Sequence, residues 1–218
     1  PSEILPSIPI FTKQAINDQI FSLSHRGQVF EQLFEDAVSQ LKKLLLIPTS
    51  YQVFFISSGT EAMERVIQNC VKQKCLHIIN GRFAERFYKT ALELGKNAQK
   101  YNAAGSFFAK DLQATKSIEL IAFTQNDTST GMAIPIQEIY KTARKYPQAL
   151  IAIDAVSSMP YVDINYKKVD CVFFSVQKGF GMPSGLGILI LSPRAINKAK
   201  QLKEKGVSIG SYHSFISL

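Results

Sequence analysis

The sequence predicts an α/β fold, a three-layer sandwich in which helices flank a mostly parallel sheet on both faces. Short apolar runs alternate with helix-like segments over all 218 residues, the order of elements that such a sheet requires. Small polar turns and a lysine directly follow several of the apolar runs, at the edge where open α/β sheets bind ligands. The composition, 46% hydrophobic and 19% charged residues, is that of an ordinary globular domain with a substantial core.

The first half of the chain is predicted to contain four helices and three strands after a proline-rich, extended start. Apolar residues recur with helical periodicity over 28–46, and Pro48 ends this helix. Gly95 closes the last helix of this half, because glycine readily adopts the left-handed conformation of a helix end. The helices are predicted over residues 11–21, 28–46, 60–72 and 84–94, and the strands over 52–56, 75–79 and 98–101.

The second half is predicted to add four strands and two helices. Proline is tolerated in the first turn of a helix, so Pro135 and Pro193 mark helix starts. The polar stretch 102–117 has no regular pattern. The strands are predicted over residues 118–123, 149–154, 171–175 and 187–191, and the helices over 135–145 and 193–205.

Lys178 follows the apolar run 169–176 and precedes Gly179 and Gly181. Burial at the end of a strand disfavours an ammonium and lowers the pKa of a lysine from its free value of about 10.4. A neutral amine is a nucleophile, and its most useful reaction is Schiff-base formation with an aldehyde or a carbonyl substrate. A lysine that only begins a solvated loop would have the same local sequence, so the choice depends on other stretches.

Two other stretches favour a Schiff-base lysine. Asp154 ends an apolar strand 24 residues before Lys178, which leaves room for one crossover to a neighbouring strand. The run 53–64 is typical of a strand, a small polar turn and a helix start, where free N–H groups and the hydroxyls of Ser58 and Thr60 suit a phosphate. A lysine, an acid and a phosphate site are together what pyridoxal phosphate requires.

At these residues the sequence resembles a known family, the class V aminotransferases among the fold type I pyridoxal-phosphate enzymes, and within it is most similar to the phosphoserine aminotransferase family. Five short motifs carry the resemblance, and they follow one another in the family's order across almost the whole chain. They are Ser24-His25-Arg26-Gly27, the run 58–64, Asn126-Asp127-Thr128-Ser129-Thr130-Gly131, the run 154–158, and Ser175-Val176-Gln177-Lys178-Gly179.

The resemblance implies a role for each candidate site residue. Lys178 would hold pyridoxal 5'-phosphate as an internal aldimine and later move the substrate proton, and Asp154 would pair with the ring nitrogen. Phe83 would stack on the ring, a geometry that suits a flat cofactor. The other implied contacts are Ser58, Gly59, Thr60 and Gln177 at the phosphate, Asn126 and Thr128 facing the cofactor with Thr128 at the phenolic oxygen, and Val156 on the ring face opposite Phe83.

The resemblance also implies the domain organisation and a partner. Residues 1–20 would form an N-terminal arm, 21–210 the large cofactor-binding domain, and 211–218 the start of a linker to a small C-terminal domain that this chain lacks. The family is normally a homodimer with a shared active site. His25 and Arg26 would then contact the anionic group of a substrate in the neighbouring subunit's site, although they would equally suit a helix-entry cap and a surface charge.

The expected reaction transfers an amino group from an amino acid, phosphoserine or another acidic donor, to a 2-oxo acid. Glu61 complicates this expectation, because phosphoserine aminotransferases usually have an arginine there and a carboxylate would repel an acidic substrate. Alternatives are another class V reaction, such as alanine– or serine–glyoxylate transamination or a desulfurase- or lyase-like reaction, and a catalytically inactive paralogue. A desulfurase would need a mobile cysteine, and none of the three cysteines lies in a convincing loop.

Bulk properties exclude several other classes of function. The net charge is +8, but the lysines are scattered and no aromatic residues interleave them, so we expect solvated faces and no nucleic-acid surface. No phosphate-binding loop of the nucleotide-binding type follows the first strand. Three cysteines without metal-like spacing predict no metal site and suit a reducing cytoplasm. No apolar run is long enough to span a membrane.

Overall fold

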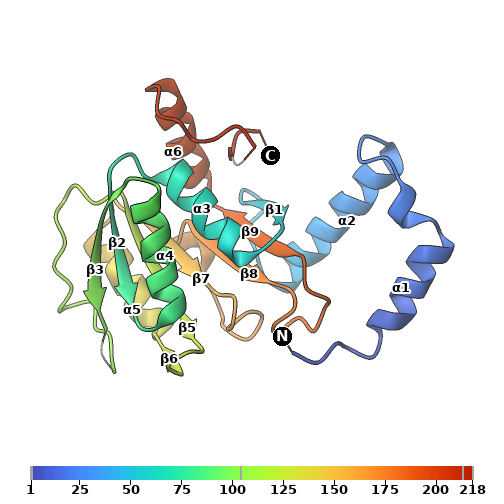
Figure 1. Cartoon of the computed structure of the whole chain (residues 1–218), viewed down its shortest axis with the longest axis horizontal. Helices are drawn as coiled ribbons and strands as arrows, with labels where there is room; N and C mark the ends of the chain where they lie inside the picture. The colour runs from blue at the N-terminus through green and yellow to red at the C-terminus, as the bar shows by residue number, and fades with distance from the viewer. Residues whose placement is uncertain (1, 104, 213, 218) are drawn as a thin grey trace.

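The computed structural model describes residues 2–103, 105–212 and 214–217. In this part of the chain, seven strands form one sheet in the order β1-β9-β8-β7-β4-β2-β3 (Figure 1). β9 pairs antiparallel with both of its neighbours, β1 and β8, whereas the other pairs are parallel, so the prediction of a mostly parallel α/β sheet is confirmed. The strands are β1 (Gln52–Ile56), β2 (Lys74–Ile79), β3 (Asn97–Asn102), β4 (Leu120–Thr124), β7 (Leu150–Asp154), β8 (Cys171–Ser175) and β9 (Gly187–Leu191).

The helices agree closely with those predicted from sequence, with one exception. The first helix begins three residues earlier than predicted, because Pro9 falls in its first turn, where proline is tolerated. The helices are α1 (Ile8–Asn17), α2 (Gln28–Leu44), α3 (Gly59–Cys70), α4 (Arg82–Glu93), α5 (Ile136–Lys145) and α6 (Pro193–Glu204), with short 3₁₀ segments η1 (Ile20–Ser22) and η2 (Tyr166–Lys168). The polar turn after β4 contains a small hairpin, β5 (Asn126–Asp127) and β6 (Met132–Ala133).

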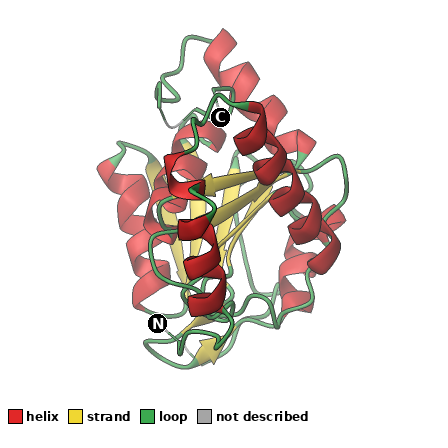
Figure 2. Cartoon of the chain, turned by 90° about the vertical axis from the view of Figure 1, so that its right-hand side faces the viewer, coloured by secondary structure: helices red, strands yellow, loops and turns green. Residues whose placement is uncertain are grey.

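Helices lie on both faces of the sheet (Figures 1 and 2), and each face has its own apolar core. On one face α3, α4 and α6 cover the sheet, with Val66, Phe87 and Ala199 among the buried side chains. On the other face the cover comes from α5, from the C-terminal part of α2 and from irregular segments, including Phe107 and Leu112 of the stretch for which no element is predicted. The three-layer arrangement therefore forms with fewer helices on the second face than on the first.

α1 and α2 extend away from the sheet as a separate arm (Figure 1). Neither helix has a fully buried residue among those described. The apolar stripe predicted over 28–46 does form, but only its C-terminal part, with Val38 and Leu41, packs on the core. Nearer the start of α2, Val29 remains 63% and Leu33 44% exposed. The periodicity thus predicts the helix correctly, but this chain alone does not cover its apolar face.

Candidate active site

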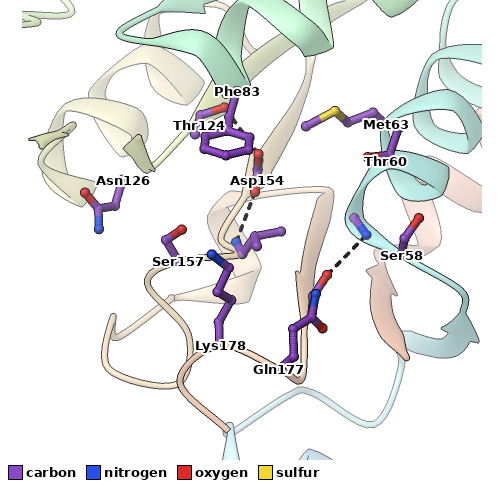
Figure 3. Close-up of a pocket in the computed structure, with 13 residues that line it drawn as sticks. Ser58, Thr60, Met63, Phe83, Thr124, Asn126, Asp154, Ser157, Gln177 and Lys178 are labelled. Carbon is purple, nitrogen blue, oxygen red and sulfur yellow. Dashed lines mark hydrogen bonds between the residues drawn. The ribbon is translucent and has the colours of Figure 1, made fainter. Parts of the chain in front are cut away.

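A cavity of about 190 Å³ lies at the carboxyl ends of the parallel strands (Figure 3). The turn after β1 contributes Ser58, Gly59, Thr60 and Met63, and the first turn of α4 contributes Phe83. The ends of β4 and β7 contribute Thr124, Asn126, Asp154, Val156 and Ser157. The end of β8 contributes Ser175, Gln177 and Lys178. Eight of the predicted cofactor contacts and Asn126 therefore surround one space, although they come from five segments of the chain.

Asp154 is a buried acid, only 3% exposed, at the end of β7. Its carboxylate accepts hydrogen bonds from the Val156 amide at 3.0 Å and from the Thr124 hydroxyl at 3.4 Å. Burial raises the pKa of Asp154 to about 6, against the lowering effect of those two donors and of Lys178. Among the described residues it forms no ion pair, so the cavity contains a carboxylate whose charge a cationic ligand group would stabilise.

Lys178 lies on a tight turn after β8 and is half-buried rather than enclosed. The turn packs closely on the segment after β7, because a Cβ at Gly179 would lie 2.4 Å from the Met159 carbonyl oxygen. The start of the chain runs beside the same turn, where the amide and hydroxyl of Ser2 donate to the carbonyls of Gln177 and Lys178. Figure 3 shows Lys178 and Asp154 extending into the same cavity.

The turn between β1 and α3 has the features of an anion site. The Ser58 hydroxyl caps α3 by accepting from the Glu61 amide at 3.1 Å, and the Gly59 amide donates to the Ser175 hydroxyl at 3.2 Å. The Thr60 amide is left without a partner among the described residues, and it lies at the positive end of the helix dipole. The side-chain oxygen of Gln177, close by, is also buried without a partner in that part of the chain.

Glu61 does not line the cavity. It accepts hydrogen bonds of 2.6 Å from both the amide and the hydroxyl of Ser57, and it pairs with Arg65, which is 2% exposed. Burial acts to raise the pKa of Glu61, but the hydrogen bonds from Ser57 and the Arg65 guanidinium outweigh it and hold that pKa below its usual range. The repulsion of acidic substrates expected from this carboxylate is therefore largely cancelled by Arg65.

Asp127, which the sequence does not single out, positions the aromatic wall of the cavity. It is completely buried and accepts from the amides of Phe83 at 2.9 Å and Ala84 at 3.1 Å, so it caps α4 from the neighbouring hairpin. Its second oxygen accepts from the amide and the hydroxyl of Ser129. A Cβ at Gly81 would lie 2.2 Å from the Asp127 carboxyl carbon, so glycine is required beside it.

Three predicted site residues lie outside the cavity. Thr128 is exposed in the turn of the β5–β6 hairpin, and Thr124 is the threonine that faces Asp154 instead. His25 and Arg26 are exposed between η1 and α2, on the arm that extends away from the sheet (Figure 1). The site as this chain forms it is therefore a cofactor-sized pocket without those two cationic side chains.

The described residues contain neither a metal-like cluster nor a membrane-length helix. No group of three or more histidine, cysteine or acidic side chains in that part of the chain could bind a metal ion. None of the helices described there is long and apolar enough to cross a membrane. Cys70, Cys75 and Cys171 are all buried and reduced, and none of them lines the cavity.

The sheet order, with one antiparallel strand and a lysine and an acid at the ends of adjacent parallel strands, defines the large-domain fold of the fold type I pyridoxal-phosphate enzymes. Within that class the chain belongs to the class V aminotransferase family, whose model matches residues 1–214. The chain is 43% identical to a phosphoserine aminotransferase of Cytophaga hutchinsonii, with a TM-score of 0.96 over all of this chain and 61% of that one.

Other relatives are less similar to this chain. A phosphoserine aminotransferase of Rhodococcus opacus is 29% identical over 210 residues, which is 94% of this chain and 54% of that protein. An aspartate aminotransferase of Thermus thermophilus is 26% identical, with a TM-score of 0.78 over all of this chain and 66% of that one. The chain spans about half the length of the curated relatives that it matches.

Proposed function

We propose that the protein is a pyridoxal-phosphate-dependent aminotransferase that transfers the amino group of an acidic amino acid, phosphoserine being the first candidate, to a 2-oxo acid. The observation that carries the proposal is the position of Lys178 and Asp154 in one cavity, beside an anion-binding turn. Two unsatisfied features fit the cofactor: the buried Asp154 without an ion pair among the described residues, and the Thr60 amide without a partner in the same part of the chain.

Pyridoxal phosphate, when bound, supplies an electron sink that makes the substrate α-proton removable. Asp154 would bind the protonated ring nitrogen, and Thr124 and the Val156 amide orient its carboxylate for this contact. Thr60, Ser58 and Gln177 would bind the phosphate at the start of α3. The Phe83 ring and the Val156 side chain would contact the two faces of the cofactor ring.

Lys178 would carry the proton transfer. Its flexible side chain extends from the turn into the cavity, so the amine can both anchor the aldehyde and afterwards accept and return the α-proton of the substrate. The close packing at Gly179 and the bonds from Ser2 fix the backbone of the turn while the side chain moves. Such fixed positioning is a large part of the advantage that an amine held in an active site has over one in solution.

The experiment that tests the proposal is a visible absorption spectrum with borohydride reduction. We expect the protein incubated with pyridoxal phosphate to show a band that borohydride bleaches, with a pyridoxyl mass fixed on the peptide that contains Lys178. Lys178→Ala should lose the fixed mass and at least about a thousandfold of transaminase turnover. Retention of turnover by Lys178→Ala would refute the assignment, and a matched Lys116→Ala variant controls for nonspecific Schiff bases.

Two further parts of the proposal concern the substrate and the partner. The Glu61–Arg65 pair leaves an acidic donor acceptable, and comparison of phosphoserine, glutamate and alanine as donors tests this choice.

We also propose a homodimer, because the exposed apolar faces of α1 and α2 are what a second subunit would cover. Light scattering that shows only monomers at micromolar concentration would contradict the dimer.

A further inference from the structure

A second cavity, of about 620 Å³, lies at the opposite edge of the sheet from the candidate active site. Ala149 and Asp170, which line it, immediately precede β7 and β8, whereas Asp154 ends β7 and Lys178 follows β8. Five strand residues separate the two edges, which places the cavities about 15 Å apart. We call this second cavity the basal groove; the end of α5, the segment 167–170 and the start of α6 form its walls.

Four cationic side chains and one acid line the basal groove. The cations are Arg144, Lys167, Lys168 and Arg194, and the acid is Asp170. Asp170 is already balanced within the chain: it accepts from the Ile151 amide and the Ser192 hydroxyl, each at 2.9 Å, and forms an ion pair of 3.7 Å with Arg194. Once this pair is set aside, three positive charges remain around one cavity.

The three remaining cations have no acidic partner among the residues that the structure describes. Arg144 and the Lys167 ammonium form no ion pair among the described residues, and the Lys168 ammonium lies 4.7 Å from the centre of the Tyr140 ring. Some lysines outside the groove do have acidic partners: Lys198 is 2.6 Å from Glu119 and Lys141 is 2.5 Å from Glu138. Burial, with a smaller contribution from the Asp163 carboxylate, raises the pKa of Tyr140 and of Tyr166. Asp163 itself lines a different cavity.

We propose that the basal groove binds a small multivalent anion of the phosphate-ester or diphosphate class. Three uncompensated cations converge on one cavity, and a di- or triphosphate group carries the complementary charge in a compact form. The positive end of α6 adds to the same potential. A nucleic-acid backbone fits less well, because it requires a stripe of cations along the surface and not a cluster around one cavity. The proposal is independent of the reaction at the other edge of the sheet.

The first experiment locates the ligand by lysine protection. The 218-residue protein is treated with an amine-acylating reagent at low ionic strength, with and without inorganic pyrophosphate, and the modified lysines are quantified by mass spectrometry. We expect pyrophosphate to slow the modification of Lys167 and Lys168 at least fivefold and to leave the exposed Lys89 and Lys116 unchanged. Equal protection of all four lysines, or of none, would overturn the proposal.

The second experiment measures affinity with charge-matched variants. Lys167→Ala/Lys168→Ala removes two charges from the basal groove, and Lys89→Ala/Lys116→Ala removes two from elsewhere. In calorimetric titrations we expect the first double variant to bind pyrophosphate at least tenfold more weakly than the unmodified protein, and the second to bind within twofold of it. Any binding at the α3 turn is common to all three proteins. Equal weakening in both variants would show a general surface-charge effect and would overturn the site.

Discussion

Asp154 and Asp170 are two buried aspartates at opposite edges of the same pair of strands. Both are less than one-tenth exposed, and in both burial raises the pKa of the carboxyl group. Asp170 has a cation, a hydroxyl and an amide as partners, and together they join β7, β8 and α6. Asp154 has an amide and a hydroxyl but, in the described part of the chain, no ion pair, and it faces a cavity.

The comparison shows what distinguishes a structural acid from a functional one at equal burial. The partners of Asp170 offset only part of the desolvation that raises its pKa, but its hydrogen bonds and ion pair join three elements, so the side chain contributes to stability. The charge of Asp154 is stabilised only in part, so the folded protein holds it at a cost that a cationic ligand would relieve. If this is correct, removal of the two carboxylates should change the stability of the cofactor-free protein in opposite directions.

The largest effect is expected for Asp170→Ala. The substitution leaves the Ile151 amide and the Ser192 hydroxyl without their acceptor and leaves Arg194 without its ion pair. We expect the free energy of unfolding to fall by about 3 kcal/mol, measured by urea denaturation at pH 7. Arg194→Gln, which removes a half-exposed partner, should cost less than about 1 kcal/mol. A loss below that value for Asp170→Ala would show that its partners do not stabilise the fold.

A third buried group, His77, tests whether lack of a partner is enough to mark a ligand site. Its two ring nitrogens are buried without partners in the described residues, between Phe87 and Tyr88, and it lines none of the cavities. Burial lowers the pKa of His77 to about 3. The unfolded chain therefore binds a proton that the folded chain does not, and stability falls as the pH decreases from about 6.5 towards 3, by at most about 1.4 kcal/mol per pH unit.

The measurement for His77 is a comparison of urea denaturation at pH 7 and pH 5. We expect the free energy of unfolding of the unmodified protein to include a loss of about 2 kcal/mol from this histidine between those values. A His77→Leu variant should lack that component and should otherwise resemble the unmodified protein. An unchanged pH dependence in His77→Leu would show that the ring is protonated in the folded state.

The sequence predicts the elements well and singles out most of the residues that meet in the cavity, because both depend on local patterns. The limits of β7 and β8 follow from continuous apolar runs, and Asp154 and Lys178 are recognisable because each follows such a run. Contacts between distant residues are not recognisable in this way. The Thr124 hydroxyl reaches Asp154 across 30 residues of chain, and the Ser175 hydroxyl reaches the Gly59 amide across 116.

The exposed part of α2 shows a second limit of prediction from sequence. Helical periodicity predicts that the stripe with Val29 and Leu33 is covered, but it says nothing about what covers it. In this chain those side chains remain exposed, and so do His25 and Arg26 just before them. Sequence patterns therefore identify the apolar surface, whereas only the arrangement in space shows that the described residues leave it exposed.

Asp154→Asn should have a smaller effect on stability than Asp170→Ala, and of opposite sign. The folded-state pKa of Asp154, about 6, lies above the ordinary value of 3.8, so stability is lost as the pH rises through this window. Asparagine removes the buried charge, and we expect the cofactor-free protein to gain about 1–2 kcal/mol at pH 8 and little at pH 4. The same variant should bind pyridoxal phosphate at least tenfold more weakly, measured by absorbance titration. Destabilisation at pH 8 would contradict the distinction between the two acids.

The smallest effect is expected for Asp127, which combines features of both acids. Like Asp170 it is satisfied by the chain, through Phe83, Ala84 and Ser129, and like Asp154 it lies beside the cavity. In Asp127→Asn one oxygen becomes an NH₂ group that cannot accept from the backbone donors it faces, so the cap on α4 weakens by about 1 kcal/mol. Because that cap fixes the first turn of α4, the Phe83 ring should lose its alignment in the cavity.

Two measurements separate positioning by Asp127 from simple loss of stability. We expect Asp127→Asn to bind pyridoxal phosphate about threefold to tenfold more weakly under conditions where the fold is intact, and to shift the visible circular dichroism of the bound cofactor. Ser129→Ala removes the hydroxyl that donates to Asp127 but keeps the bond from the backbone amide of residue 129 and the bonds from the Phe83 and Ala84 amides. It should reduce stability slightly and leave the dichroism unchanged. An equal dichroism change in both variants would mean that the hairpin as a whole, and not the bond to the Phe83 amide, sets the aromatic wall.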